Sequence, residues 1–129
     1  MADERQEYVD RMYRDRGYVL DFHSILAAED YDFLQGYNAL INSGYTKPRT
    51  LDAKTKELLY IAALTAVGGS EDHIRVHVEL ALKYGATKAE TLETLELTLA
   101  PAGVPRFMVG FQAWAQAVSP DRVKPNTDD

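Results

Sequence analysis

The chain has 129 residues, of which 46% are hydrophobic and 26% charged, and its formal net charge is −6. This length suits one globular domain with a modest core. The acidic balance argues against binding to nucleic acid or to an anionic membrane, because both need a basic surface. The absence of cysteine excludes disulfides, thiolate chemistry and thiolate metal ligands. With a highly charged N-terminal stretch that is unlike a signal peptide, these features predict a cytoplasmic protein.

Apolar residues recur at helical spacing along most of the chain, without the alternation typical of strands, so an all-α fold is predicted. A first amphipathic helix is expected over residues 3–16. Residues 18–27 are short and apolar, and are compatible with a turn followed by a brief helix. A second helix is expected over residues 29–42, closed by the Ser43–Gly44 pair.

The middle of the chain predicts two helices joined by a tight turn. Asp52 is a suitable N-cap for a helix that runs to about Val67. This helix is apolar nearly all round, so we expect it to be central and buried. After a Gly-Gly turn at residues 68–69, the next helix begins at the N-cap Ser70 and stops at Gly85.

Two more helices complete the prediction. Thr87 and Glu90 form a capping box that opens the first of them, and the segment 101–105 breaks the chain before a last helix at about residues 105–118. The expected architecture is a bundle of about six helices around a central antiparallel helix hairpin.

The division along the chain is expected to be one domain overall. Residues 1–50 form an N-terminal helical segment that packs on a core of residues 51–118. Residues 119–129 are polar and contain two prolines, which predicts a flexible tail.

Two of the three histidines, His73 and His77, lie one helical turn apart on a helix side that is otherwise apolar. In the preceding helix, Glu57 is a carboxylate in apolar surroundings, and a buried carboxylate needs a partner. If the two helices form a hairpin, Glu57 can face His77 and orient its imidazole for acid–base work. His73, in the first turn of its helix, meets the positive end of the helix dipole and should stay neutral.

Two other interpretations of these residues stay open. The histidines could simply be packed and hydrogen-bonded core residues. His73, His77 and Glu57 could also supply a two-histidine, one-carboxylate metal site, although the residues between the histidines offer no further ligand. His23 is expected to be incidental. Tyr31, Tyr37 and Tyr45 could line a pocket, but their helical spacing favours the core.

The segments KELLYIAALTAVGG, H-x-x-x-H, ALKYGATKAETLE and AGVP occur in an order that resembles the carboxymuconolactone decarboxylase family, which includes the alkylhydroperoxidase D-like proteins. The resemblance covers residues 51–118. It implies an all-α subunit built around a helical hairpin and assembled into homotrimers or homohexamers. His77 matches the family histidine, and Glu57 matches the family glutamate.

The resemblance also implies which activity is absent. The two cysteine positions of the peroxidase branch fall on Ser70 and His73, so a thiol peroxidase or disulfide reductase is excluded.

The decarboxylase branch lacks that thiol pair and needs no cofactor. Its reaction removes CO₂ from a carboxylated unsaturated γ-lactone, a small molecule, and leaves an enolate that must be protonated. His77 would then be the general acid–base, Glu57 its orienter and His73 a polarising hydrogen-bond donor. The candidates for holding the substrate carboxylate are three arginines, Arg49, Arg75 and Arg106. The alternative is a catalytically idle family member that serves as a structural or small-molecule-binding protein.

Overall fold

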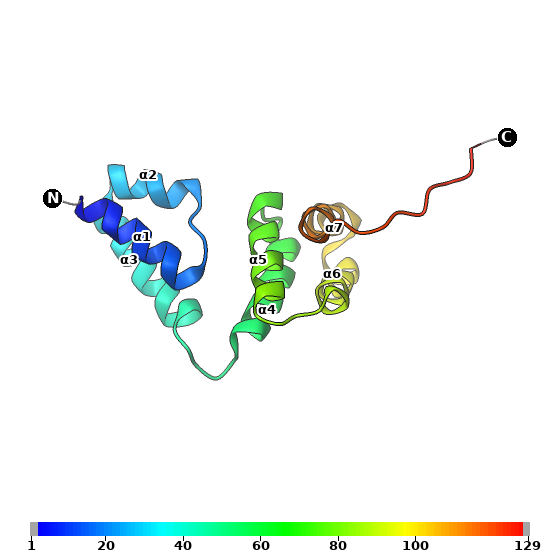
Figure 1. Cartoon of the computed structure of the whole chain (residues 1–129), viewed down its shortest axis with the longest axis horizontal. Helices are drawn as coiled ribbons and strands as arrows, with labels where there is room; N and C mark the ends of the chain where they lie inside the picture. The colour runs from blue at the N-terminus through cyan, green and yellow to red at the C-terminus, as the bar shows by residue number, and fades with distance from the viewer. Residues whose placement is uncertain (1–2, 128–129) are drawn as a thin grey trace. The chain divides into compact units, whose positions relative to one another are not determined.

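The computed structural model describes residues 3–127, and within this range the chain is all-helical, without strands (Figure 1). One five-residue π-helix, η1 (Asn42–Thr46), accompanies the α-helices. The α-helices are, in chain order, α1 (Glu4–Arg16), α2 (Asp21–Glu29), α3 (Tyr31–Ile41), α4 (Ala53–Val67), α5 (Glu71–Lys83), α6 (Lys88–Ala102) and α7 (Val104–Val118). The all-α prediction is therefore confirmed.

The chain divides into two compact units, and the division falls inside α4 between Lys56 and Glu57. The prediction that residues 1–50 pack on the remainder stays a prediction. None of the described helices is long and apolar enough to cross a membrane.

The first unit contains α1, α2, α3 and η1 around a small core of Met12, Ala27 and Leu34. Asp3 caps α1 by accepting from the Arg5 backbone N–H, and Gly17 ends the helix with a φ of 83°. That positive φ is a conformation that glycine adopts without steric cost, so the sequence sets the stop. The short apolar stretch over residues 18–27, where a turn and a brief helix were expected, leads into the helix α2.

The end of α3 differs from the sequence prediction. The helix does not close at Ser43 and Gly44 but widens into η1, with the Lys47 backbone N–H bonded to the Asn42 carbonyl at 2.9 Å. The Lys56 ammonium donates to the carbonyls of Tyr45 and Lys47, at 3.0 and 2.8 Å. The Lys56 side chain thus provides hydrogen bonds to carbonyls at the end of the helix. The Ser43–Gly44 pair alone could not predict this contact, because Lys56 lies further along the chain.

The second unit contains α4 from Glu57 onward together with α5, α6 and α7 (Figure 1). Helix α7 packs against both α5 and α6. The single tryptophan, Trp114, is 3% exposed in this core, and its indole N–H donates to the Thr91 hydroxyl at 2.9 Å. A buried indole needs such an acceptor, so the threonine is part of the core design. The buried residues of the cluster are Ile61, Ile74, Val78, Ala81, Ala86, Leu95, Ala113 and Trp114.

The crossing of α7 over its neighbours depends on Gly110. A β-carbon at this position would stand 2.7 Å from the Thr65 hydroxyl oxygen and 2.8 Å from Leu95 Cδ2. The backbone of α7 therefore approaches α4 and α6 as closely as a glycine permits.

The expectation that α4 is central and buried holds for only one face of the helix. Its buried residues are Glu57, Ile61 and Thr65, which follow one another at intervals of four and so share one helix face. Leu59 and Val67 are 53% and 71% exposed. Although α4 is apolar nearly all round, only one narrow face of it is buried against the core.

The predicted break at 101–105 is shorter in the structure. Pro101 lies inside α6, which continues to Ala102, and the single residue Gly103, with a φ of 89°, leads directly into α7. Pro101 has no N–H to donate to the Leu97 carbonyl, so the last turn of α6 lacks one helix hydrogen bond, and the positive φ of Gly103 makes the turn.

Candidate functional site

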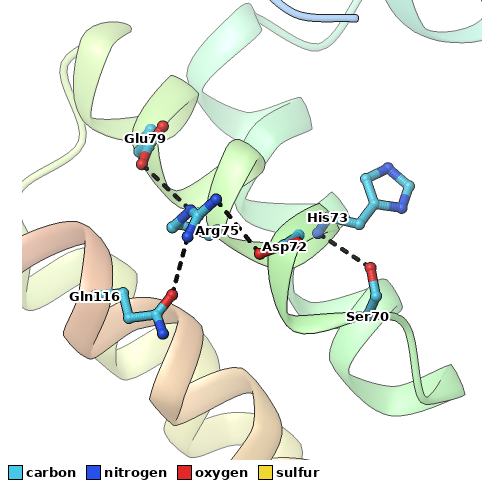
Figure 2. Close-up of polar contacts among 6 residues, drawn as sticks. All are labelled: Ser70, Asp72, His73, Arg75, Glu79 and Gln116. Carbon is cyan, nitrogen blue, oxygen red and sulfur yellow. Dashed lines mark hydrogen bonds and ion pairs between the residues drawn. The ribbon is translucent and has the colours of Figure 1, made fainter. Parts of the chain in front are cut away.

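The helix that carries both histidines is set by its caps. Ser70 has an extended backbone, and its hydroxyl accepts from the His73 backbone N–H at 3.2 Å (Figure 2). Glu71 and Asp72 occupy the first turn, where the positive end of the helix dipole favours carboxylates. These local interactions fix the start of α5. They therefore also fix the helix face on which residues 73 and 77 lie.

The predicted contact between Glu57 and His77 is present. Nδ1 of His77 lies 2.6 Å from Oε2 of Glu57, and the two side chains are 0% and 3% exposed. A carboxylate only accepts hydrogen bonds, so the imidazole donates its Nδ1 proton. The carboxylate thereby holds the ring in one orientation and one tautomer. This contact joins α4 to α5 across the turn at residues 68–69.

His73 lies beside this pair. Its ring centroid is 5.1 Å from that of His77, and its side chain is half-buried. Burial lowers the pKa of His73 below 6.5, and the neighbouring His77 lowers it further. The predicted neutral state of His73 at pH 7 agrees with this direction. The causes are desolvation and a second imidazole, whereas the sequence argument relied on the helix dipole.

Tyr60 borders the same pair, and sequence reasoning did not single it out. Its ring centroid lies 5.0 Å from that of His77, and the side chain is half-buried. Tyr60 follows Glu57 by three residues on α4, so both lie on neighbouring positions of one helix face. This three-residue spacing from Glu57 was the feature of the sequence that could have indicated Tyr60 as a neighbour of the site. A phenol next to the His77 imidazole adds another group able to donate a hydrogen bond to an oxygen anion.

The structure does not bring Arg75 to the histidines. Its guanidinium pairs with Asp72 at 3.4 Å and Glu79 at 3.7 Å. It also donates to the Gln116 side chain at 3.0 Å. In Figure 2 these contacts lie on one side of α5, while the His73 ring points away on the other side.

The other two candidate arginines donate to backbone carbonyls. Arg106, on α7, donates to the Ala66 carbonyl near the C-terminal end of α4 and lies next to Gly68. Arg49, in the first unit, donates to the Ser43 carbonyl at 3.3 Å. A role of any of the three in holding a substrate carboxylate stays a prediction.

The metal interpretation needs three ligands that converge on one point. Among residues 3–127, no group of three or more His, Asp or Glu side chains is arranged to hold a metal ion. In addition, the 2.6 Å contact commits one oxygen of Glu57 to His77 Nδ1. The geometry of the site is therefore that of a carboxylate-oriented imidazole with a second imidazole and a phenol beside it.

The resemblance to the carboxymuconolactone decarboxylase family implied an all-α subunit built around a helical hairpin, with His77 and Glu57 at the positions of the family histidine and glutamate. A profile of that family matches residues 31–116, which is two thirds of the chain, and the chain belongs to the carboxymuconolactone decarboxylase family. The match begins 20 residues before the resemblance noticed in the sequence and so takes in α3. Comparison with curated proteins and with solved structures gives no match. The chain contains no cysteine, in keeping with a branch that lacks the redox pair.

Proposed function

We propose that this protein is a cofactor-independent lyase that decarboxylates a small carboxylated lactone or a related enolisable acid. The observation that carries the proposal is the buried contact between His77 and Glu57, at 2.6 Å, in a chain of the carboxymuconolactone decarboxylase family. Family membership supports the reaction class without fixing the substrate, since one fold hosts several activities.

The reaction needs stabilisation of negative charge and one well-placed acid. The C–C bond to the carboxylate breaks, CO₂ leaves, and the electron pair passes into the conjugated carbonyl to give an enolate. His77, entering this step with a proton on both ring nitrogens, gives its Nε2 proton to the enolate carbon and is left neutral with its remaining proton on Nδ1. Glu57 keeps the Nδ1 proton of His77 in place, so that proton exchange is directed to Nε2.

His73 and Tyr60 suit the other requirement of the reaction. A neutral imidazole and a phenol each offer a hydrogen bond to oxygen, and in a half-buried site such bonds are stronger than in water. The lowered pKa of His73 favours a neutral donor, which avoids placing a second cation beside His77.

A second candidate has its own observation. The side chain of His77 is 0% exposed, so in this conformation the imidazole offers no surface to a substrate. A family member without activity, in which Glu57 and His77 join α4 to α5 as a buried pair, would show the same burial. This protein would then be a structural or small-molecule-binding protein.

Two conservative variants distinguish the candidates. His77→Gln and Glu57→Gln keep a hydrogen-bonding side chain of similar size, so both should fold. In the lyase, each variant should lower CO₂ release from a carboxylated unsaturated γ-lactone by about 10²–10⁴-fold, the usual worth of acid–base assistance. Circular dichroism should remain that of the unmodified chain.

Glu79→Gln is the matched control, because Glu79 is an exposed carboxylate on α5 whose ion pair with Arg75 is solvated. Its CO₂ release should equal that of the unmodified protein. Undiminished release by the folded His77→Gln protein would refute the assignment. Absence of release by the unmodified protein from any lactone tested, together with unfolding of the variants at lower temperature, would favour the idle family member.

A further inference from the structure

A cavity of about 260 Å³ lies within the first unit, between α1 and α2. On the α2 side its lining side chains are small, because Ser24, Ala27 and Ala28 stand at positions i, i+3 and i+4 and so share one helix face. On the α1 side the lining comes from the start of the helix. The space is smaller than the ~300–1,000 Å³ of pockets for drug-sized ligands, so it suits a small molecule.

The inner part of this cavity is apolar. Ala27, on α2, is 5% exposed and belongs to the core of the first unit. Val9, on α1, is half-buried and packs against the same core. Both side chains line the cavity, so a short hydrocarbon group placed against them would leave water and gain contact with apolar surface.

The outer part of the cavity carries a fixed guanidinium. Nη1 of Arg5 donates to the Ala28 carbonyl at 2.8 Å. The guanidinium carbon also lies over the Tyr31 ring, at 5.8 Å from the ring centroid. These two contacts hold the group in place and use one of its five N–H donors, so the others remain for a ligand.

A carboxylate of opposite charge lines the same cavity. Oδ1 of Asp3 accepts from the Arg5 backbone N–H at 2.9 Å as the N-cap of α1, and this cap does not need the second oxygen. Within residues 3–127, the Asp3 and Arg5 side chains form no ion pair with each other or with a third group. Both charges are therefore available to a ligand.

Two charges of opposite sign on one small cavity disfavour a ligand of a single sign. An anion on Arg5 would be repelled by the Asp3 carboxylate, and a cation on Asp3 would be repelled by the Arg5 guanidinium. A zwitterion gives each of the two side chains an opposite charge. The apolar inner part adds that the ligand should carry hydrocarbon next to its charged groups.

We propose that this cavity binds a small α-amino acid with a short hydrocarbon side chain. The carboxylate of the ligand accepts from the free N–H groups of Arg5, and its ammonium group donates to Oδ2 of Asp3. Its hydrocarbon side chain lies against Val9 and Ala27. The hydroxyl of Ser24, on the α2 side, supplies one further polar group that can donate or accept.

Amide NMR of the full chain tests the proposal with three probes of matched shape. Valine carries both charges, isovalerate lacks the ammonium group and isobutylamine lacks the carboxylate. Valine should shift the Ser24 and Ala27 amide signals with a dissociation constant of about 1–10 mM, since Asp3 and Arg5 are exposed. Each single-charge probe should bind about tenfold more weakly. Equal affinity for valine and either of them, or no saturable shift with valine, would overturn the proposal.

Removal of one charge at a time should change which probe matches valine. Asp3→Asn keeps an equally good N-cap, so α1 stays capped, but the variant should bind valine no better than isovalerate. Arg5→Gln should bind valine no better than isobutylamine. A purely structural role of these residues would not change the preference among the probes. A preference for valine that persists in either folded variant therefore refutes the assignment.

A third variant tests the location, and a fourth is the matched control. Ala28→Leu keeps both charges but fills part of the cavity from an exposed position, so it should fold and lose the valine-dependent shifts. Arg14→Gln removes an exposed arginine from the last turn of α1, outside the cavity lining, and should keep the affinity of the unmodified chain. Valine binding retained by the folded Ala28→Leu protein, or lost in Arg14→Gln, would place the ligand elsewhere.

Discussion

The close crossing at Gly110 gives a stability prediction whose size follows from the structure. In Gly110→Ala the new methyl group would stand 2.7 Å from Thr65 Oγ1 and 2.8 Å from both Thr65 Cγ2 and Leu95 Cδ2. Leu95 can move the end of its side chain, but Thr65 is β-branched and stiff on α4. Overpacking of this kind costs about 1–3 kcal/mol.

Alanine has an opposing effect on the helix itself. It is more favourable than glycine in a helix interior by roughly 1 kcal/mol, so Gly110→Ala should lower the free energy of unfolding by about 0–2 kcal/mol. The matched control is Gly36→Ala in α3, where a β-carbon meets nothing within 4 Å. It should gain about 0.5–1 kcal/mol from the same change in propensity.

Urea unfolding followed by circular dichroism measures both variants, and fluorescence of the buried Trp114 reports the second unit on its own. In a Thr65→Ala background the methyl group has room, so Gly110→Ala should cost less there than in the unmodified chain. Stabilisation of the unmodified protein by Gly110→Ala, to the extent seen for Gly36→Ala, would refute the inferred crossing.

Further predictions concern the site, the core and the assembly. An NMR titration should place the His73 midpoint below 6.5, and His77→Gln should move it part of the way back, because burial remains. The folded pKa of His73 is depressed, so its contribution to stability should be complete above pH 6.5 and be lost as the pH falls toward the folded value. Thr91→Val should cost about 1–3 kcal/mol in thermal unfolding, because the Trp114 N–H loses its buried acceptor. Prolonged chelation should leave CO₂ release unchanged, and loss of activity together with one metal per subunit would support the metal interpretation. Sedimentation at micromolar concentration should show a homotrimer or homohexamer of the 14.5 kDa chain.

The helix ends that sequence could predict are those set by local chemistry. Ser70 and Thr87 cap α5 and α6 as expected, because a cap is a contact between residues three apart. The Glu57–His77 contact was also predictable, since a two-glycine turn leaves few ways to fold a hairpin. Its partner Tyr60 lies three residues from Glu57, but nothing local distinguishes a phenol at a site from one in a core.

The parts that escaped prediction depend on contacts between distant segments. Arg16 looked like one more charged residue of an exposed helix, yet it is buried because Asn38 and His23 come from other helices. Likewise, Tyr84 lies at helical spacing from Leu80 of the core side but is 39% exposed. The spacing of Tyr84 fits the apolar face of α5. Tyr84 is, however, the C-cap residue, at which α5 ends and the chain changes direction.

The same reasoning bears on the expected assembly. An apolar helix was expected to be buried, yet Leu59 and Val67 on α4 are exposed, as are Leu97 on α6 and Met108 on α7, all by more than half. Soluble chains seldom leave such side chains uncovered in number, and closed symmetry is the usual way to cover them. The apolar residues of α4 that one chain leaves exposed therefore favour self-association, in which a second copy of the chain would cover them. Substituting Leu59 and Leu97 with serine should then shift the sedimenting species toward the monomer without loss of helix. A native chain that already sediments as a folded monomer would show that this apolar surface needs no cover.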